Sequence, residues 1–164
     1  MGLGERLGWV RQKVAALGAR LDFLPLLLAR VTVGWVFVNS GWGKLHHLDK
    51  VVEYFRDLGI PAADLQAPIA AGTELVAGAA LLFGLLTRAA SLPLIVVMLV
   101  ALGTAKRDDI ESANALFGLI EFAYIVLLVQ LAVRGGGKLS LDAAISARMP
   151  TPSTPAAISA PASA

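Results

Sequence analysis

The sequence contains no cysteine among its 164 residues. This absence excludes disulfide exchange and thiolate catalysis by the chain, because both need a sulfur nucleophile. It also excludes iron–sulfur clusters held by cysteine and haem attached through a Cys-x-x-Cys-His motif. The chain by itself therefore lacks the usual sulfur-based redox centres.

Histidine is also scarce. The two histidines, His46 and His47, are adjacent. Neighbouring side chains on a helix point about 100° apart, so this pair is poorly placed to share one metal ion. We therefore predict an interfacial structural role for the pair, with a weak metal or quinone contact at the outer surface as the alternative, and assign no metal site in the chain.

Charge is low, whereas apolar residues are abundant. The formal net charge of +2 is too small to indicate nucleic-acid binding, and no nucleic-acid motif occurs. The chain is 57% hydrophobic, with a mean hydropathy of +0.72, against about 45–50% apolar residues in soluble domains. The excess lies in four blocks, at approximately 23–42, 68–87, 89–105 and 113–133. Each suits one membrane span of about 17–25 residues, which predicts an all-α polytopic membrane protein with a four-transmembrane-helix bundle.

The segments outside the blocks have distinct patterns. Residues 1–20 carry an apolar stripe with basic flanks, which predicts an amphipathic helix lying on a lipid surface before a membrane domain at 21–146. The pattern of residues 45–58 predicts a short helix ended by Gly59 and Pro61. Ser140 is a candidate N-terminal cap for a second short helix that follows it. The Pro/Ala/Ser composition of 147–164 predicts a disordered tail.

Orientation follows from the lysines and arginines outside the blocks. With the N-terminus inside, eight lie on the inner side and five on the outer side. The positive-inside rule then places both termini in the cytoplasm.

Charged residues inside the blocks or next to their ends define a candidate polar core. A charge such as Arg30 costs about 2.5–3.5 kcal/mol at the centre of a span on insertion scales. The sequence offers two basic and two acidic candidates with one amide, and small residues beside them for close helix packing. The polar candidates are Arg30, Lys44, Glu74, Glu121 and Asn114, and the packing candidates are Gly34, Gly41 and Gly78.

Depth along the spans suggests the pairing of these charges. Arg30 lies about 10 Å from the inner start of its block, and Glu121 about 12 Å from the outer start of its own. We expect Arg30 to pair with Glu121, with Glu74 as the second choice, and Lys44 to pair with Glu74. Such charges either lock the bundle or mark a proton path or polar ligand site, and the sequence leaves both readings open.

Several segments together resemble the DoxX family of small four-helix membrane proteins. The likeness covers about residues 24–146 and is carried by "LLLARVTVGWVFVNSGWGKL", "GIPAADL", "AAGTELVAGAALLFGLLTRAASLPLIVVMLVA" and "GGGKLSLD". The positions matching the family pattern are Arg30, Gly34, Gly41, Lys44, Glu74, Gly84, Arg88 and Asp142. The resemblance implies a bacterial inner-membrane protein, a redox protein as partner in some relatives, and quinone as the candidate cofactor.

Two functions remain open at this stage. The first is a non-catalytic membrane subunit or anchor for a quinone-linked or oxidative-stress redox partner. The second is a small carrier or proton-coupled transporter, which would work as a homodimer through Arg30, Glu74 and Glu121. An enzyme acting alone ranks below both, because the sequence has no nucleophile–base set and no metal-ligand set.

Overall fold

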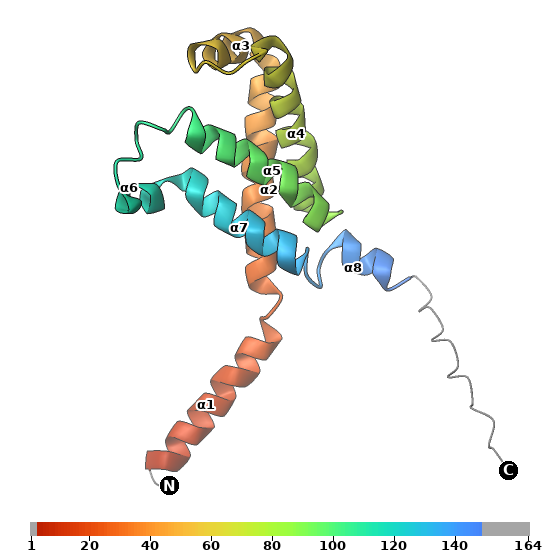
Figure 1. Ribbon diagram of the computed structural model, residues 1–164. Helices are drawn as coiled ribbons and strands as arrows, with labels where there is room; N and C mark the ends of the chain where they lie inside the picture. The colour runs from red at the N-terminus through yellow and green to blue at the C-terminus, as the bar shows by residue number, and fades with distance from the viewer. Residues whose placement is uncertain (1–2, 149–164) are drawn as a thin grey trace, which may run out of the picture.

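The computed structural model describes residues 3–148, and within that range every regular element is an α-helix (Figure 1). The helices are α1 (Leu3–Arg20), α2 (Leu24–His46), α3 (Leu48–Asp57), α4 (Ala63–Phe83), α5 (Thr87–Gly103), α6 (Ala113–Gly118), α7 (Ile120–Arg134) and α8 (Leu141–Ser146). The all-α fold class is thus confirmed, and α1 and α3 fall within the segments 1–20 and 45–58 for which helices were predicted. The predicted disordered tail at 147–164 lies almost entirely outside the described residues.

Two of the described helices, α2 and α4, are long and apolar enough to cross a membrane. At 1.5 Å per residue, their 23 and 21 residues reach roughly 34 and 31 Å, close to the ~30 Å thickness of a hydrocarbon core. The 17 residues of α5 are apolar but reach only roughly 25 Å.

The fourth predicted span, 113–133, is not one continuous helix. The chain is extended at Leu119 (φ −76°, ψ 135°), which divides the segment into α6 and α7. Gly118 precedes the break, and glycine is a weak helix former because it loses much backbone entropy. The break places Glu121 in the first turn of α7 rather than deep inside a span.

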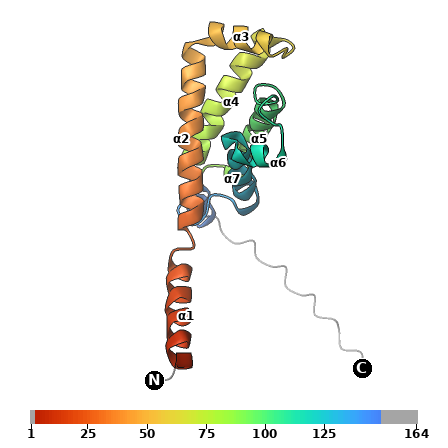
Figure 2. The same ribbon diagram turned by 90° about the vertical axis from the view of Figure 1, so that its left-hand side faces the viewer.

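α2 and α4 lie side by side along most of their length (Figure 2). A methyl group added at Gly41 would lie 2.5 Å from the backbone nitrogen of Leu75 and 2.7 Å from the carbonyl oxygen of Ala71. One added at Gly78 would lie 2.9 Å from Cβ of Phe37, and Gly34 is equally crowded. These glycines let the two backbones approach closely, which maximises dispersion contacts between the helices.

The other helices complete the bundle around this pair. α5 packs against α4 and α7, and the shared core consists mainly of large apolar side chains from α2, α4, α5 and α7. The fully buried ones are Val33, Phe37, Leu81, Leu94, Leu128 and Leu131. α3 lies across one end of α2 and α4, and α8 lies near the opposite end (Figures 1 and 2). We refer to these as the α3 end and the α8 end.

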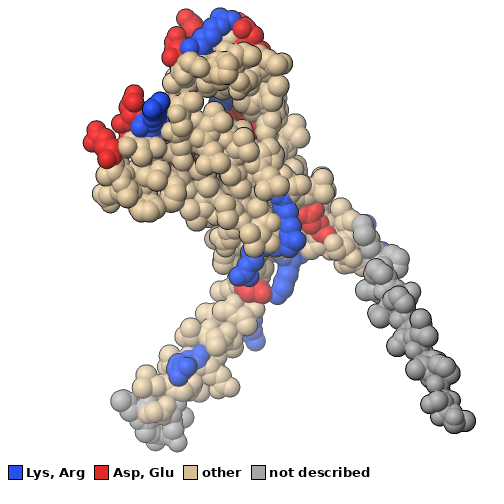
Figure 3. All heavy atoms as spheres, viewed as in Figure 1, with Lys and Arg blue, Asp and Glu red and all other residues tan. Residues whose placement is uncertain are grey.

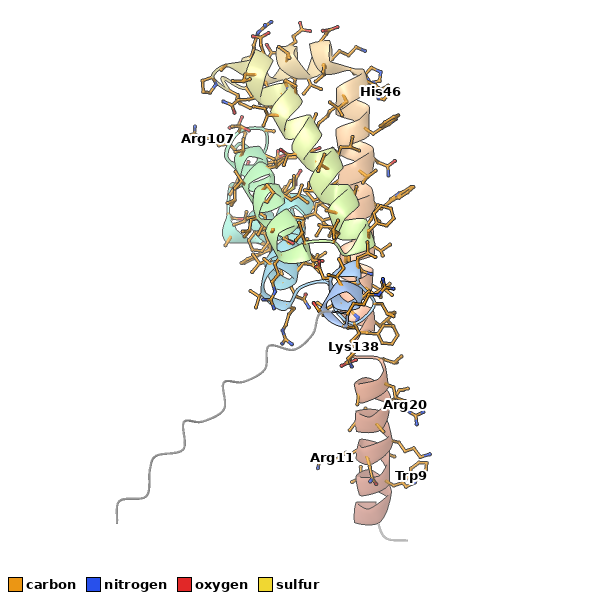
Figure 4. The ribbon with its side chains drawn as sticks, turned by 90° about the vertical axis from the view of Figure 1, so that its right-hand side faces the viewer. Trp9, Arg11, Arg20, His46, Arg107 and Lys138 are labelled. Carbon is orange, nitrogen blue, oxygen red and sulfur yellow. The ribbon has the colours of Figure 1, made fainter. Side chains whose placement is uncertain are left out.

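α1 projects away from the bundle at the α8 end (Figure 2). Its large apolar side chains are exposed, including Leu7, Val10, Val14 and Leu17. Figure 4 shows Arg11 on one side of this helix and Trp9 and Arg20 on the other. The apolar stripe of α1 is therefore left uncovered by the described part of the chain.

Candidate functional site

Arg30 is buried at the α8 end of α2, with only 4% of the residue exposed. Its Nη2 donates a hydrogen bond of 2.5 Å to the carbonyl oxygen of Leu139, and its Nη1 makes a longer contact of 3.4 Å to that of Gly136. Both carbonyls belong to the segment that joins α7 to α8. The guanidinium thus binds the backbone of the "GGGKLS" loop.

The predicted pairing of Arg30 with Glu121 is wrong, and so is the second choice of Glu74. Glu121 lies at the end of α7 remote from the loop that Arg30 contacts. The pKa of Lys106 is raised mainly by its hydrogen bond to Asp109 and the charge of that residue, with a smaller contribution from the charge of Glu121, which places Glu121 near Lys106. The depth estimate assumed an unbroken helix over 113–133, and the break at Leu119 removes that assumption.

Asp142 is the acid that accompanies Arg30. Its carboxylate accepts hydrogen bonds from the backbone N–H groups of Leu86 (2.7 Å) and Thr87 (2.9 Å). Its own N–H donates to the carbonyl of Gly84 at 2.9 Å. Burial acts to raise the pKa of Asp142, but these N–H donors and the charge of Arg30 outweigh it, so the pKa is lowered.

Arg30 and Asp142 together fasten three segments to one another. These are α2, the turn between α4 and α5, and the loop leading into α8. Gly84 lies in that turn with φ +67°, and a side chain there would collide with the Arg30 guanidinium. Ser140 caps α8 as predicted, because its hydroxyl accepts the N–H of Ala143 at 3.1 Å. We call this arrangement the Arg30 clamp.

Cations surround a groove of about 720 Å³ beside the clamp. Arg88, Arg134 and Lys138 line it together with the backbone of the three-glycine loop 135–137. Lys138 also pairs with Asp22 at 2.9 Å, which ties the segment between α1 and α2 to this face. Figure 3 shows basic side chains gathered here, between the bundle and α1, and Figure 4 labels Lys138 at the same place.

The second charged pair lies at the α3 end. Lys44, in the last turn of α2, donates a hydrogen bond to Oε1 of Glu74 on α4, which is the pairing that the depths predicted. Glu74 is fully buried, and its second oxygen, Oε2, has no hydrogen-bond partner. Both residues line a cavity of about 540 Å³ between α3, α4 and α5.

The remaining candidates lie apart from these two sites. Asn114 is exposed on α6 and does not join a shared polar core. His46 and His47 each place Nδ1 within hydrogen-bond distance of the carbonyl four residues earlier, near the end of α2. Among the described residues, no group of three histidine, aspartate or glutamate side chains could hold a metal ion.

Sequence reasoning missed the role of Asp142, which was named only as a position that matches the family pattern. A signal was present in the "GGGKLSLD" segment, whose serine and aspartate are spaced to cap a helix. That spacing could not reveal that the carboxylate reaches a turn 55 residues earlier in the chain.

Comparison with known proteins identifies the class. The DoxX family model matches residues 25–107, and the chain belongs to this family. A Haemophilus influenzae protein called "Uncharacterized protein" is 31% identical over 79% of this chain and 89% of its own length. "Putative oxidoreductase CatD" of Bacillus subtilis is 31% identical over 71% and 83%. "Inner membrane protein YqjF" of Escherichia coli is 28% identical over 75% and 93%. No solved structure matches the chain.

Proposed function

We propose that the chain is a four-span protein of the bacterial inner membrane with both termini in the cytoplasm. The apolar helices α2, α4 and α5 supply three spans, and α7, extended by α6, supplies the fourth. Related proteins named as inner membrane proteins and the excess of basic residues at the α8 end support this arrangement. The α8 end then faces the cytoplasm.

We propose that α1 lies along the inner leaflet, which requires the chain to bend at residues 21–23, because α1 continues the direction of α2 in Figure 2. Its exposed stripe of Leu7, Val10, Val14 and Leu17 enters the acyl region, while Arg11 and Arg20 reach the anionic headgroups. Trp9, whose ring lies 5.0 Å from the Lys13 ammonium, suits the boundary between them.

We further propose that the protein is a non-catalytic membrane subunit for a redox partner. The observation that carries this proposal is the groove lined by Arg88, Arg134 and Lys138, which the Arg30 clamp holds in a fixed shape. A rigid cationic surface facing the cytoplasm suits an acidic patch on a partner protein. The name of the Bacillus subtilis relative supports a redox setting. Quinone as a cofactor stays a prediction.

The carrier hypothesis is less well supported by the geometry. It required Arg30, Glu74 and Glu121 to act as one site. Arg30 is instead bound to backbone carbonyls at the α8 end, and Glu74 is paired with Lys44 at the α3 end. The three charges therefore offer no common ligand position.

Purification of the tagged full-length chain from its native membrane tests this function. We expect a stoichiometric partner with a redox centre visible in its absorption spectrum. The variant Arg88→Glu/Arg134→Glu should lose that partner. The variant Lys50→Glu/Arg107→Glu, which changes the net charge by the same amount but toward the α3 end, should keep it. Impermeant labelling of an added cysteine would check that both variants keep the wild-type orientation. A lone homodimer that moves solute in liposomes would overturn the proposal in favour of the carrier.

A further inference from the structure

The cavity at the α3 end has the size and lining of a small-molecule site. Its volume of about 540 Å³ lies within the ~300–1,000 Å³ range of ligand pockets. Its walls are mainly aliphatic and aromatic, with Tyr54 and Phe55 from α3, Ile69 from α4, and Val97 and Met98 from α5. Figure 3 shows a hollow beneath α3 with charged atoms inside it.

One polar group in this cavity lacks a partner. Oε1 of Glu74 accepts from Lys44, but Oε2 of the same fully buried carboxylate accepts nothing. A buried acceptor left without a donor is costly, and carboxylates are the strongest acceptors in proteins. Lys44 in turn has three N–H donors, of which this contact uses one. The pair can therefore accept one hydrogen bond and donate another into the cavity.

The charge of the pair determines the class of ligand. Lys44 and Glu74 neutralise each other, and the other cation of the lining, Lys50, is exposed at the surface, so the buried wall of the cavity holds no excess charge with which to compensate an ionised ligand. We propose that the cavity binds an uncharged, largely apolar molecule carrying a phenol or alcohol hydroxyl. The hydroxyl donates to Oε2 of Glu74, and the ring or chain packs against the aromatic and aliphatic wall.

The rim of the cavity shows how such a molecule enters. Ile69, Val96 and Val100 line the cavity and are substantially exposed. In the four-span arrangement proposed above, these side chains of α4 and α5 face lipid, so the ligand enters from the bilayer. The entry route rests on that arrangement, but neither it nor the pocket depends on the redox partner.

A pair of matched ligands tests the site. We would measure binding of 2-naphthol and of 2-methoxynaphthalene, which lacks the hydroxyl donor, to the full-length chain in lipid nanodiscs, after subtracting partition into empty nanodiscs. We expect saturable binding of 2-naphthol and binding of the methyl ether that is weaker by about tenfold or more, as for loss of a hydrogen bond to a charged group. Glu74→Gln should remove most of this difference.

A substitution that fills the cavity keeps the test independent of the folding of Glu74→Gln. Ala101→Phe, on α5 within the cavity, should abolish saturable binding of both ligands. Ala89→Phe makes the same change at an exposed position of α5 and should leave binding unchanged. Binding no greater than in empty nanodiscs would mean that the cavity holds water only, and would overturn the proposal. Equal binding of the two ligands, or binding indifferent to Ala101→Phe, would also overturn it.

Discussion

Replacing Arg30 with methionine tests whether the Arg30 clamp holds the α8 end together. Methionine keeps the length of the apolar stem but removes all five N–H donors. The charge-assisted hydrogen bond to Leu139 contributes about 1.5–3 kcal/mol, and the longer contact to Gly136 adds less. We therefore expect Arg30→Met to lower the free energy of unfolding by about 2–4 kcal/mol.

The partner of Arg30 can be identified by double-mutant cycles. Arg30 and Asp142 act on the same three segments, so Arg30→Met and Asp142→Asn should be coupled by about 1 kcal/mol or more. Arg30→Met and Glu121→Gln should add independently, within about 0.5 kcal/mol, because Glu121 lies in the first turn of α7 and Arg30 contacts the loop that follows the last turn of that helix.

Reversible unfolding of the purified chain in mixed detergent micelles, followed by tryptophan fluorescence, measures these free energies. Arg20→Met is the matched control, because Arg20 is exposed at the end of α1 and its loss should change stability by less than about 0.5 kcal/mol. If Arg30→Met were no more destabilising than Arg20→Met, or were coupled to Glu121 rather than Asp142, the clamp would be refuted.

Three further predictions concern packing, pH and orientation. Gly41→Ala should destabilise the α2–α4 contact by about 1–3 kcal/mol in the same unfolding assay, whereas Gly43→Ala, with open space around it, should not; equal effects would refute the close approach. Asp142 has a lowered pKa, so its stabilisation is present above its unfolded pKa of about 3.9 and is lost as the pH falls through the lower folded value. Melting curves should thus show a steeper loss of stability below about pH 4 for wild type than for Asp142→Asn, and parallel curves would contradict this. An impermeant thiol reagent added to intact cells should leave Val10→Cys and Ala147→Cys unlabelled; labelling of either would contradict the proposed orientation.

Much of the fold could be predicted from hydropathy and local signals alone. Apolar runs and helical periodicity predicted the helices. Gly59 and Pro61 predicted the end of α3, and Ser140 predicted the start of α8. These features are local, since each depends on a few residues and their own backbone groups. The break at Leu119 could not be predicted in the same way, because the segment carries no proline and the one weak helix former before the break, Gly118, is of a type that apolar spans often contain.

The two charged sites differ in how far sequence could predict them, and the difference has a physical cause. Lys44 and Glu74 lie on helices that pack side by side, α2 and α4, so depth along those helices was enough to pair them. Arg30 instead donates through Nη1 and Nη2 to backbone carbonyls, which every residue carries and which no side-chain pattern reveals. The depth of a charge along its helix was still a useful guide to its partner, but only carboxylates had been considered as partners for Arg30. For a lone arginine inside an apolar helix, the candidate partners must therefore include the carbonyls of any glycine-rich loop at the same end of the bundle.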